Sequence, residues 1–260
     1  MLFALPACDQ ATNPPISSPT PVGEVSAQQT EGVFSSSSNL LQNPSLEHTT
    51  SEPWFDFADR SQSWFPHAIS NDHARSGTQS AQLVINNDNT APTAPTAILG
   101  IVQELQATQP TIPSHIAGYY KVTDWTRGTK HQYLQAVVMA TRPSNKPSGS
   151  NFPTYQIAIP LAGITEPPFK MGNRRFAFEP HNTPPAEPTL NEWVPFEFNL
   201  HDLYRHHWGF VPEHSTSFKV FFEVRYDAKE EHEHPLATVY FDALYFGTPT
   251  ETERETGAGD

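Results

Sequence analysis

The pattern of hydrophobic and polar positions divides the chain into an N-terminal arm, a folded part and a tail. Residues 9–38 are mostly Pro, Ser, Thr, Gln and Gly with few large apolar side chains, a composition that predicts a disordered linker. From residue 39 onward, apolar runs of strand length are separated by clusters of Pro, Gly, Asn and Ser. We therefore expect one folded domain over residues 39–248 and a short disordered acidic tail over residues 249–260.

Several apolar runs show the period of two that is typical of β-strands. In residues 217–226, SFKVFFEVRY, one face carries only apolar or aromatic side chains, while Lys219, Glu223 and Arg225 share the other face with Phe221. This alternation predicts a half-buried strand. The run YLQAVVMAT, residues 133–141, is apolar on both faces and predicts a central strand. Further strands are expected at residues 81–85, 98–105, 116–123, 154–159, 175–178, 191–200 and 238–246.

Helical patterns are almost absent, and the nearest candidate is one or two turns over residues 200–206. About ten strands with irregular connections favour an antiparallel β-sandwich. The 26 prolines and the 12% share of aromatic residues support an all-β fold. The length of 260 residues is ample for a sizeable core.

Charge and composition exclude several classes of function. The net charge is −13 and the 15 basic residues are scattered, which argues against nucleic-acid binding, because phosphates require clustered Lys and Arg. No stretch approaches the ~20 apolar residues of a membrane-spanning helix. The chain has one cysteine and thus no internal disulfide, and it lacks the G-x-S-x-G, P-loop and H-E-x-x-H motifs of common enzymes.

Short motifs in order along residues 39–247 resemble the galactose-binding-domain-like group of jelly-roll carbohydrate-binding modules. NLLQNPSLE, residues 39–47, resembles the N-L-x-x-N-P-x-F-E opening strand of that group. The later pieces are PW at residue 53, HARSGTQSAQL at 73, GYYKVTD at 118, NEW at 191 and VYFDALY at 239. Ala243 departs from the pattern, since the group often has an Asp there. The resemblance implies a jelly-roll β-sandwich that binds a glycan.

The same resemblance implies a structural calcium ion between the first and last strands. Its expected ligands are Glu47, Asp242 and the turn that contains Ser76. Calcium prefers such hard oxygen ligands and accepts mixed carboxylate and carbonyl sets. In the alternative interpretation, Asp242 accepts hydrogen bonds from backbone groups or Arg and no metal is present.

Exposed aromatic rings are the expected means of sugar recognition. Trp64, Trp125 and Trp208 lie in polar loop segments and are the candidate ligand-binding residues, whereas Trp54 and Trp193 match positions that pack inside the resembling modules. In the alternative, all these rings fill the core, as most Trp and Phe residues of a sandwich do. His232 and His234 have the H-x-H spacing of some metal sites, but their acidic surroundings favour a solvated hairpin tip between the last two strands.

Leu5-Pro-Ala-Cys8 resembles the lipobox of bacterial lipoproteins, in which the cysteine becomes lipidated. Residues 1–8 are therefore expected to be the remnant of a signal peptide that ends in the lipidation residue Cys8. This interpretation places the protein in a bacterial cell envelope, anchored by lipid on the periplasmic face or at the cell surface. The alternative is a chance cysteine in a disordered arm.

Together these features predict a non-catalytic, glycan-binding lipoprotein of the cell envelope. A protein-interaction or scaffold module on the same fold is an alternative, because sandwiches of this kind carry many functions. A polysaccharide hydrolase or lyase with an unrecognised site is a further alternative, although the paired carboxylates of jelly-roll glycosidases are not visible in the sequence.

Overall fold

The computed structural model describes residues 38–56, 67–86, 96–228, 230 and 233–250. The chain divides into two units, Met1–Thr30 and Glu31–Asp260, and every described residue belongs to the second. Cys8 and Trp64 lie outside the described residues, as do the linker and the acidic tail except for their ends. Within the described part, no helix is both long and apolar enough to cross a bilayer.

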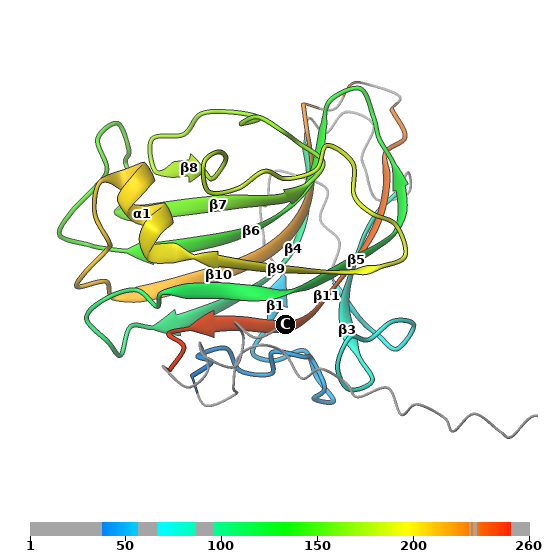
Figure 1. The fold of residues 1–260 in the computed structure, drawn as a ribbon, viewed down its shortest axis with the longest axis horizontal. Coiled ribbons are helices and arrows are strands. Elements are labelled where there is room, and N and C mark those ends of the chain that lie inside the picture. The colour runs from blue at the N-terminus through cyan, green and yellow to red at the C-terminus, as the bar shows by residue number, and fades with distance from the viewer. Residues whose placement is uncertain (1–37, 57–66, 87–95, 229, 231–232, 251–260) are drawn as a thin grey trace, which may run out of the picture. The chain divides into compact units, whose positions relative to one another are not determined.

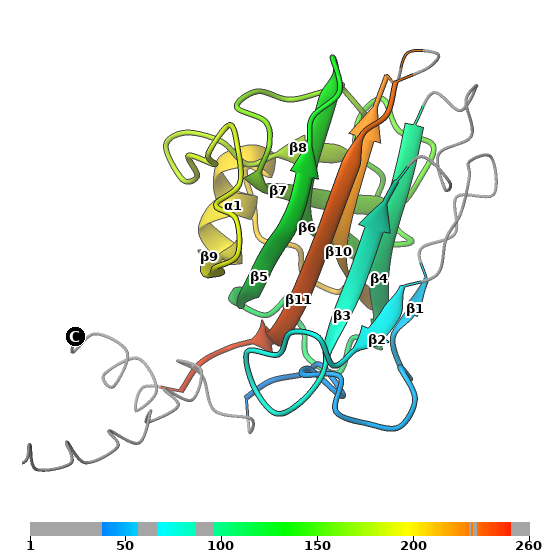
Figure 2. The same ribbon diagram turned by 90° about the vertical axis from the view of Figure 1, so that its right-hand side faces the viewer.

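The second unit is a sandwich of two β-sheets (Figures 1 and 2). The six-stranded sheet has the order β1 (Phe55–Asp56), β4 (Thr96–Gln106), β10 (Ser217–Asp227), β6 (His131–Thr141), β7 (Thr154–Ala162) and β8 (Arg174–Phe176). The five-stranded sheet has the order β2 (Ala68–Ser70), β3 (Ser80–Ile85), β11 (Leu236–Gly247), β5 (His115–Thr126) and β9 (Trp193–Asn199). All pairings are antiparallel except that of β7 with β8. The all-β jelly-roll prediction is confirmed.

The core lies between the sheets and is rich in aromatic rings. Phe222 of β10 contacts Phe241 of β11, with ring centroids 5.5 Å apart, and neither side chain is exposed. Trp54 and Phe196 each lie 6.0 Å from Phe222. Such offset and tilted ring pairs stabilise a core beyond the area that they bury. The expectation that Trp54 packs inside the sandwich is correct.

The short helix expected after the strand at residue 191 is present as α1 (Leu200–Trp208). Its N-cap is Asn199, whose side chain accepts a hydrogen bond from the backbone N–H of Asp202. Its C-cap is Gly209 in the left-handed conformation. The helix begins at Leu200, so the preceding strand is shorter than the predicted range 191–200.

The prediction that residues 217–226 form a half-buried strand is wrong. β10 is a central strand, and its polar face is buried as well as its apolar face. The segment between β7 and β8 covers this polar face, since the ring of Phe169 lies 5.5 Å from the guanidinium of Arg225. Phe169 also packs against a small apolar cluster on the outer face of this sheet, formed by Val102, Val137, Ala158, Phe176 and Phe221.

The segment that joins β10 to β11 is not a hairpin, contrary to prediction. The two strands belong to different sheets and do not pair with each other. His234 is exposed there, and His232 lies outside the described residues. Across the described ranges, no three His, Cys, Asp or Glu side chains are arranged to hold a metal ion.

Candidate functional site

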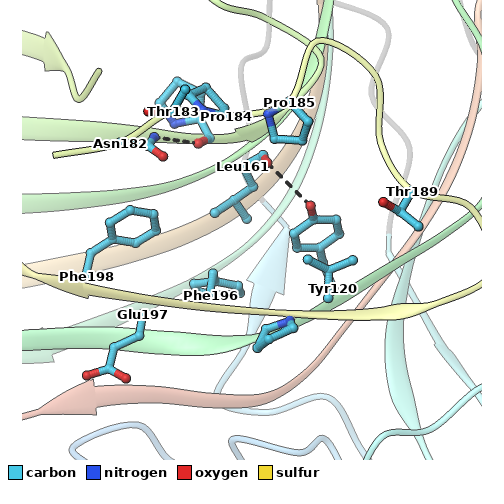
Figure 3. Close-up of a pocket in the computed structure, with 13 residues that line it drawn as sticks. Tyr120, Leu161, Asn182, Thr183, Pro184, Pro185, Thr189, Phe196, Glu197 and Phe198 are labelled. Atoms are coloured by element: carbon cyan, nitrogen blue, oxygen red, sulfur yellow. Dashed lines mark hydrogen bonds between the residues drawn. The ribbon is translucent and has the colours of Figure 1, made fainter. Parts of the chain in front are cut away.

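A hollow opens between the edge strand β9 and strand β7 (Figure 3). Its volume is ≈ 320 Å³, near the lower end of the range for small-molecule sites. Residues 182–189, which read NTPPAEPT, form one wall. The aromatic lining comes from Tyr120, Phe196 and Phe198, and the polar side chains that line it are those of Asn182, Thr183 and Thr189.

The alternation of β9 determines which of its side chains face the hollow. Phe196 is buried and Phe198 is partly buried against the main core, while Glu197 points to the other side of the strand (Figure 3). Partial burial raises the pKa of Glu197. The hollow therefore has a ring-lined wall, with a carboxylate on the opposite side of the same strand.

Two side chains hold the back of the hollow in place. The hydroxyl of Tyr120, on β5, lies 3.4 Å from the carbonyl oxygen of Leu161 on β7, and burial raises the pKa of this tyrosine to about 12. The amide nitrogen of Asn182 donates to the carbonyl oxygens of Pro160 at 2.8 Å and Ala177 at 3.1 Å. These bonds connect both sheets and the 182–189 segment, so the hollow is largely preformed.

Trp125, a predicted sugar contact, lies near the end of β5 and is partly buried against the core. Its indole N–H donates to Glu187 at 2.7 Å, and the other carboxylate oxygen of Glu187 pairs with Arg127 at 3.0 Å. Because Glu187 belongs to the 182–189 segment, these contacts anchor one wall of the hollow. Direct contact of Trp125 with a sugar stays a prediction.

Trp208, the second predicted contact, is the last residue of α1 and is also partly buried. The guanidinium of Arg175 lies 4.1 Å from the centre of its ring, and Tyr155 meets it edge-on at 5.0 Å. The described contacts do not bring Trp208 and Trp125 together. Sugar binding by Trp208, like that by Trp64, stays a prediction.

Trp193 differs from expectation. It lies opposite Lys121 on the outer face of the five-stranded sheet and is partly exposed, rather than packed inside the sandwich. Its neighbour in the chain, Val194, takes the inward position.

The predicted calcium residues come together around the turn at residues 75–79. Glu47 Oε1 accepts the N–H groups of Thr78 at 2.8 Å and Gln79 at 2.7 Å. Asp242 is not exposed, and its Oδ2 accepts the N–H groups of Arg75 at 2.6 Å and Ser76 at 2.9 Å. Burial raises the pKa of Asp242 to about 6, opposed by these N–H donors and assisted by the negative charge of Glu47.

This junction has the kind of oxygen atoms that calcium prefers. The two carboxylates repel each other, and the hydroxyl of Ser76 lies 3.4 Å from Asp242 Oδ1. A cation held by these oxygens would relieve the repulsion. The same oxygens also accept backbone N–H groups, so the hydrogen bonds satisfy both carboxylates without an ion. Calcium binding stays a prediction.

Comparison with known proteins gives distant similarities of fold only. No protein-family model matches the chain, and no curated protein matches it. The solved structures that resemble it include the carbohydrate-binding module TmCBM61 in complex with β-1,4-galactotriose, at 10% identity and a TM-score of 0.42, covering 81% of this chain and 98% of that one. CBM28, a module specific for non-crystalline cellulose, matches at 12% identity and a TM-score of 0.41, covering 80% and 95%. The enzymatically active domain of bacteriophage CBA120 tailspike protein 4 matches at 12% identity and a TM-score of 0.42, covering 80% of this chain but only 21% of that one.

Proposed function

We propose that this protein is a non-catalytic glycan-binding module and that the hollow between β9 and β7 receives the glycan. The observation that carries the proposal is the lining of the hollow, which combines the rings of Phe196 and Phe198 with the amide of Asn182 and the hydroxyl of Thr189. Aromatic rings pack against the C–H faces of sugars, while a few polar groups fix the orientation of the hydroxyls.

The arrangement of buried acids supports binding rather than hydrolysis. Glycosidases place two carboxyl groups on either side of the bond that is cut. On β10, Glu223 and Asp227 both contact Arg225, at 3.6 and 2.9 Å. The guanidinium thus occupies the space between the carboxylates in which a substrate would have to lie.

The test is calorimetric titration of the full chain with neutral β-linked oligosaccharides, β-1,4-galactotriose and cellotriose, comparing wild type with Phe198→Ala. We expect Phe198→Ala to weaken binding at least about tenfold, because it removes a ring from the wall. Phe152→Ala is the control, since Phe152 is 62% exposed on the β6–β7 loop, away from the hollow.

A second variant distinguishes a loss of sugar contacts from a folding defect. Thr189→Val removes one hydroxyl from an exposed position of the lining and should weaken binding without lowering the melting temperature. Absence of binding by wild type, or equal losses for Phe198→Ala and Phe152→Ala, contradicts the proposal. Absence of binding by wild type would favour a protein-interaction module.

A calcium ion at Glu47, Asp242 and Ser76 is a separate proposal, supported by the convergence of these residues on one turn. An ion that binds only the native state raises stability. We therefore expect EDTA to lower the melting temperature at pH 7 by several degrees and calcium to restore it. An unchanged melting temperature would show that the hydrogen bonds alone hold the junction.

Lipid anchoring at Cys8 is likewise a proposal, and it rests on the LPAC motif alone. Mass spectrometry of the protein purified from bacterial membranes should find acyl chains on Cys8, and Cys8→Ala should release the protein into the soluble fraction. An unmodified cysteine would favour the alternative of a chance residue in the arm.

A further inference from the structure

A second polar cluster lies on the outer face of the six-stranded sheet, away from the sandwich core. Two rows of directly paired residues form it, Gln135 of β6 opposite Glu223 of β10, and Tyr133 opposite Arg225. Asp227 lies two residues further along β10. Tyr133, Gln135 and Glu223 have no exposed surface, and Arg225 and Asp227 are 6% and 7% exposed.

At one end of the cluster every polar group has a partner. Arg225 donates to both oxygens of Asp227, from Nη2 at 2.9 Å and from Nε at 3.3 Å. The Tyr133 hydroxyl donates to Asp227 Oδ2 at 2.5 Å. Asp227 is therefore fully accommodated by its neighbours, as a buried charge has to be.

At the other end two acceptors lack a partner. Gln135 Nε2 donates to Glu223 Oε2 at 2.7 Å. The remaining oxygens, Gln135 Oε1 and Glu223 Oε1, are buried and have no hydrogen-bond partner in the described structure. A buried polar atom without a partner destabilises a protein by about 1–3 kcal/mol, so neighbouring unfilled acceptors of this kind point to a missing group.

The chemistry of the cluster restricts what that group can be. Both free atoms only accept hydrogen bonds, so the missing partner must donate. Two acids, Glu223 and Asp227, are balanced by Arg225 and by Arg174, whose guanidinium also lies near Phe169. A neutral O–H donor therefore fits better than a cation, and an anion is repelled by the Glu223 carboxylate.

A glycine makes space for the Glu223 side chain on one side of the cluster, and an aromatic ring covers it. Across from Glu223, β4 has Gly100, and a Cβ atom there would lie 2.9 Å from Glu223 Cγ. Phe169 covers the cluster from the segment between β7 and β8, and its ring is only partly buried. On the other side, Gln135 is paired with Pro160 of β7, which lines the hollow. Directly paired residues have Cα atoms about 5 Å apart, so only the backbone of β6 and β7 separates the cluster, on the outer face, from the hollow.

We propose that Gln135 and Glu223 form a closed subsite for one neutral sugar residue of the bound glycan, whose adjacent hydroxyls donate to Gln135 Oε1 and Glu223 Oε1 beneath Phe169. The inference rests on the proposed function and deepens it, because it assigns the specificity for neutral over acidic glycans to these two residues. The sugar reaches the subsite when the Phe169 segment lifts from the sheet.

The experiment is calorimetry of the full chain with β-1,4-galactotriose, and with α-1,4-trigalacturonate as the acidic probe. Gln135→Met keeps the volume but removes the free acceptor and the amide donor to Glu223 Oε2. We expect it to weaken galactotriose binding about tenfold and, because Glu223 loses that donor, to lower the melting temperature. Glu223→Gln should weaken galactotriose binding by a similar factor. It should also reduce the ratio of the affinity for galactotriose to the affinity for trigalacturonate, because the charge that repels the acidic sugar is gone.

The matched control is Gln103→Met, a buried glutamine of the same sheet whose amide is bonded at both ends to Gln42. It should lower the melting temperature and leave affinity unchanged. If Gln135→Met binds galactotriose as wild type does, the subsite is wrong while glycan binding stands. If wild type binds neither galactotriose nor cellotriose, the proposed function fails and the subsite fails with it.

Discussion

Two buried carboxylates, Asp242 and Glu223, occupy comparable places in opposite sheets and are held in different ways. Each is on a central strand and neither is exposed. Asp242 accepts backbone N–H groups from Arg75, Ser76 and Ala243. Glu223 has only side-chain partners, Gln135 and Arg225, and one of its oxygens has none in the described residues.

This difference indicates that Asp242 stabilises the fold, whereas Glu223 is able to bind a ligand. Backbone donors are fixed by the chain, so a carboxylate that they surround ties its strand to the turn that supplies them. Side-chain partners leave lone pairs free in a water-poor place, where a hydrogen bond to a ligand is strong. Burial alone does not distinguish the two cases, whereas the identity of the donors does.

The largest expected effect comes from matched isosteric changes. Asp242→Asn should lower the free energy of unfolding by about 2–4 kcal/mol, because an amide group then faces buried N–H donors. Glu223→Gln should change it by less than about 1 kcal/mol, since Arg225 keeps its stronger partner Asp227. Urea denaturation at pH 7 measures the free energy of unfolding of both variants. Equal losses would show that Asp242 and Glu223 do not differ in how they stabilise the fold.

The next largest loss of stability is expected at the turn that binds Glu47 and Asp242. Gly77 has a φ of +62°, and a Cβ atom there would lie 2.4 Å from Glu47 Cδ. Gly77→Ala should therefore lower the free energy of unfolding by about 2–3 kcal/mol through backbone strain and displacement of Glu47. Gly149 is the control, because its φ is +78° but no atom lies within 4 Å of the added Cβ. Gly149→Ala should show the strain alone, about 1 kcal/mol, and a similar loss in both variants would mean that Glu47 is not held by the turn.

The smallest effect concerns His207, a partly buried side chain whose Nε2 atom is buried and has no hydrogen-bond partner in the described part of the chain. Burial, followed by the neighbouring His206, His181 and Arg175, lowers its pKa from 6.5 to about 4. The native state therefore binds this proton less readily than the unfolded state, and the associated stability is lost as the pH falls from about 6.5 to about 4.

His207→Gln should reduce this acid-induced loss by about 1–2 kcal/mol, a value reduced for the partial exposure of the ring. Urea denaturation at pH 7 and pH 4.5 measures it. The same variant should leave glycan affinity at pH 7 unchanged. A loss of affinity would show that an unpartnered buried atom does not by itself mark the subsite, and would weaken the contrast between Asp242 and Glu223.

The sequence was sufficient to predict the sandwich, because alternation of apolar side chains reports directly on strands. It was also sufficient to place Trp193 on the outer face, since Trp193 is out of phase with Val194, Phe196 and Phe198. The resemblance to known modules implied that Trp193 packs inside the sandwich, and this prediction was wrong. The junction at Glu47 and Asp242, which the same resemblance suggested, does form.

The hollow and the polar cluster were not predictable, because each depends on segments that are distant in sequence. Alternation identifies Glu223 and Arg225 as one face of a strand but does not reveal that Phe169 covers that face. The hollow combines Phe198 of β9 with the proline-rich segment 182–189 and Leu161 of β7. The only local signal was that segment, in which Asn and Thr flank several prolines beside an aromatic strand.

The most direct test of the distinction between the two carboxylates is a pair of crystal structures, with and without bound β-1,4-galactotriose. We expect two sugar hydroxyls to lie within about 3 Å of Gln135 Oε1 and Glu223 Oε1 in the complex, with Phe169 displaced and Asp242 unchanged. A single ordered water bonded to both oxygens in each structure, with the sugar elsewhere, would contradict it.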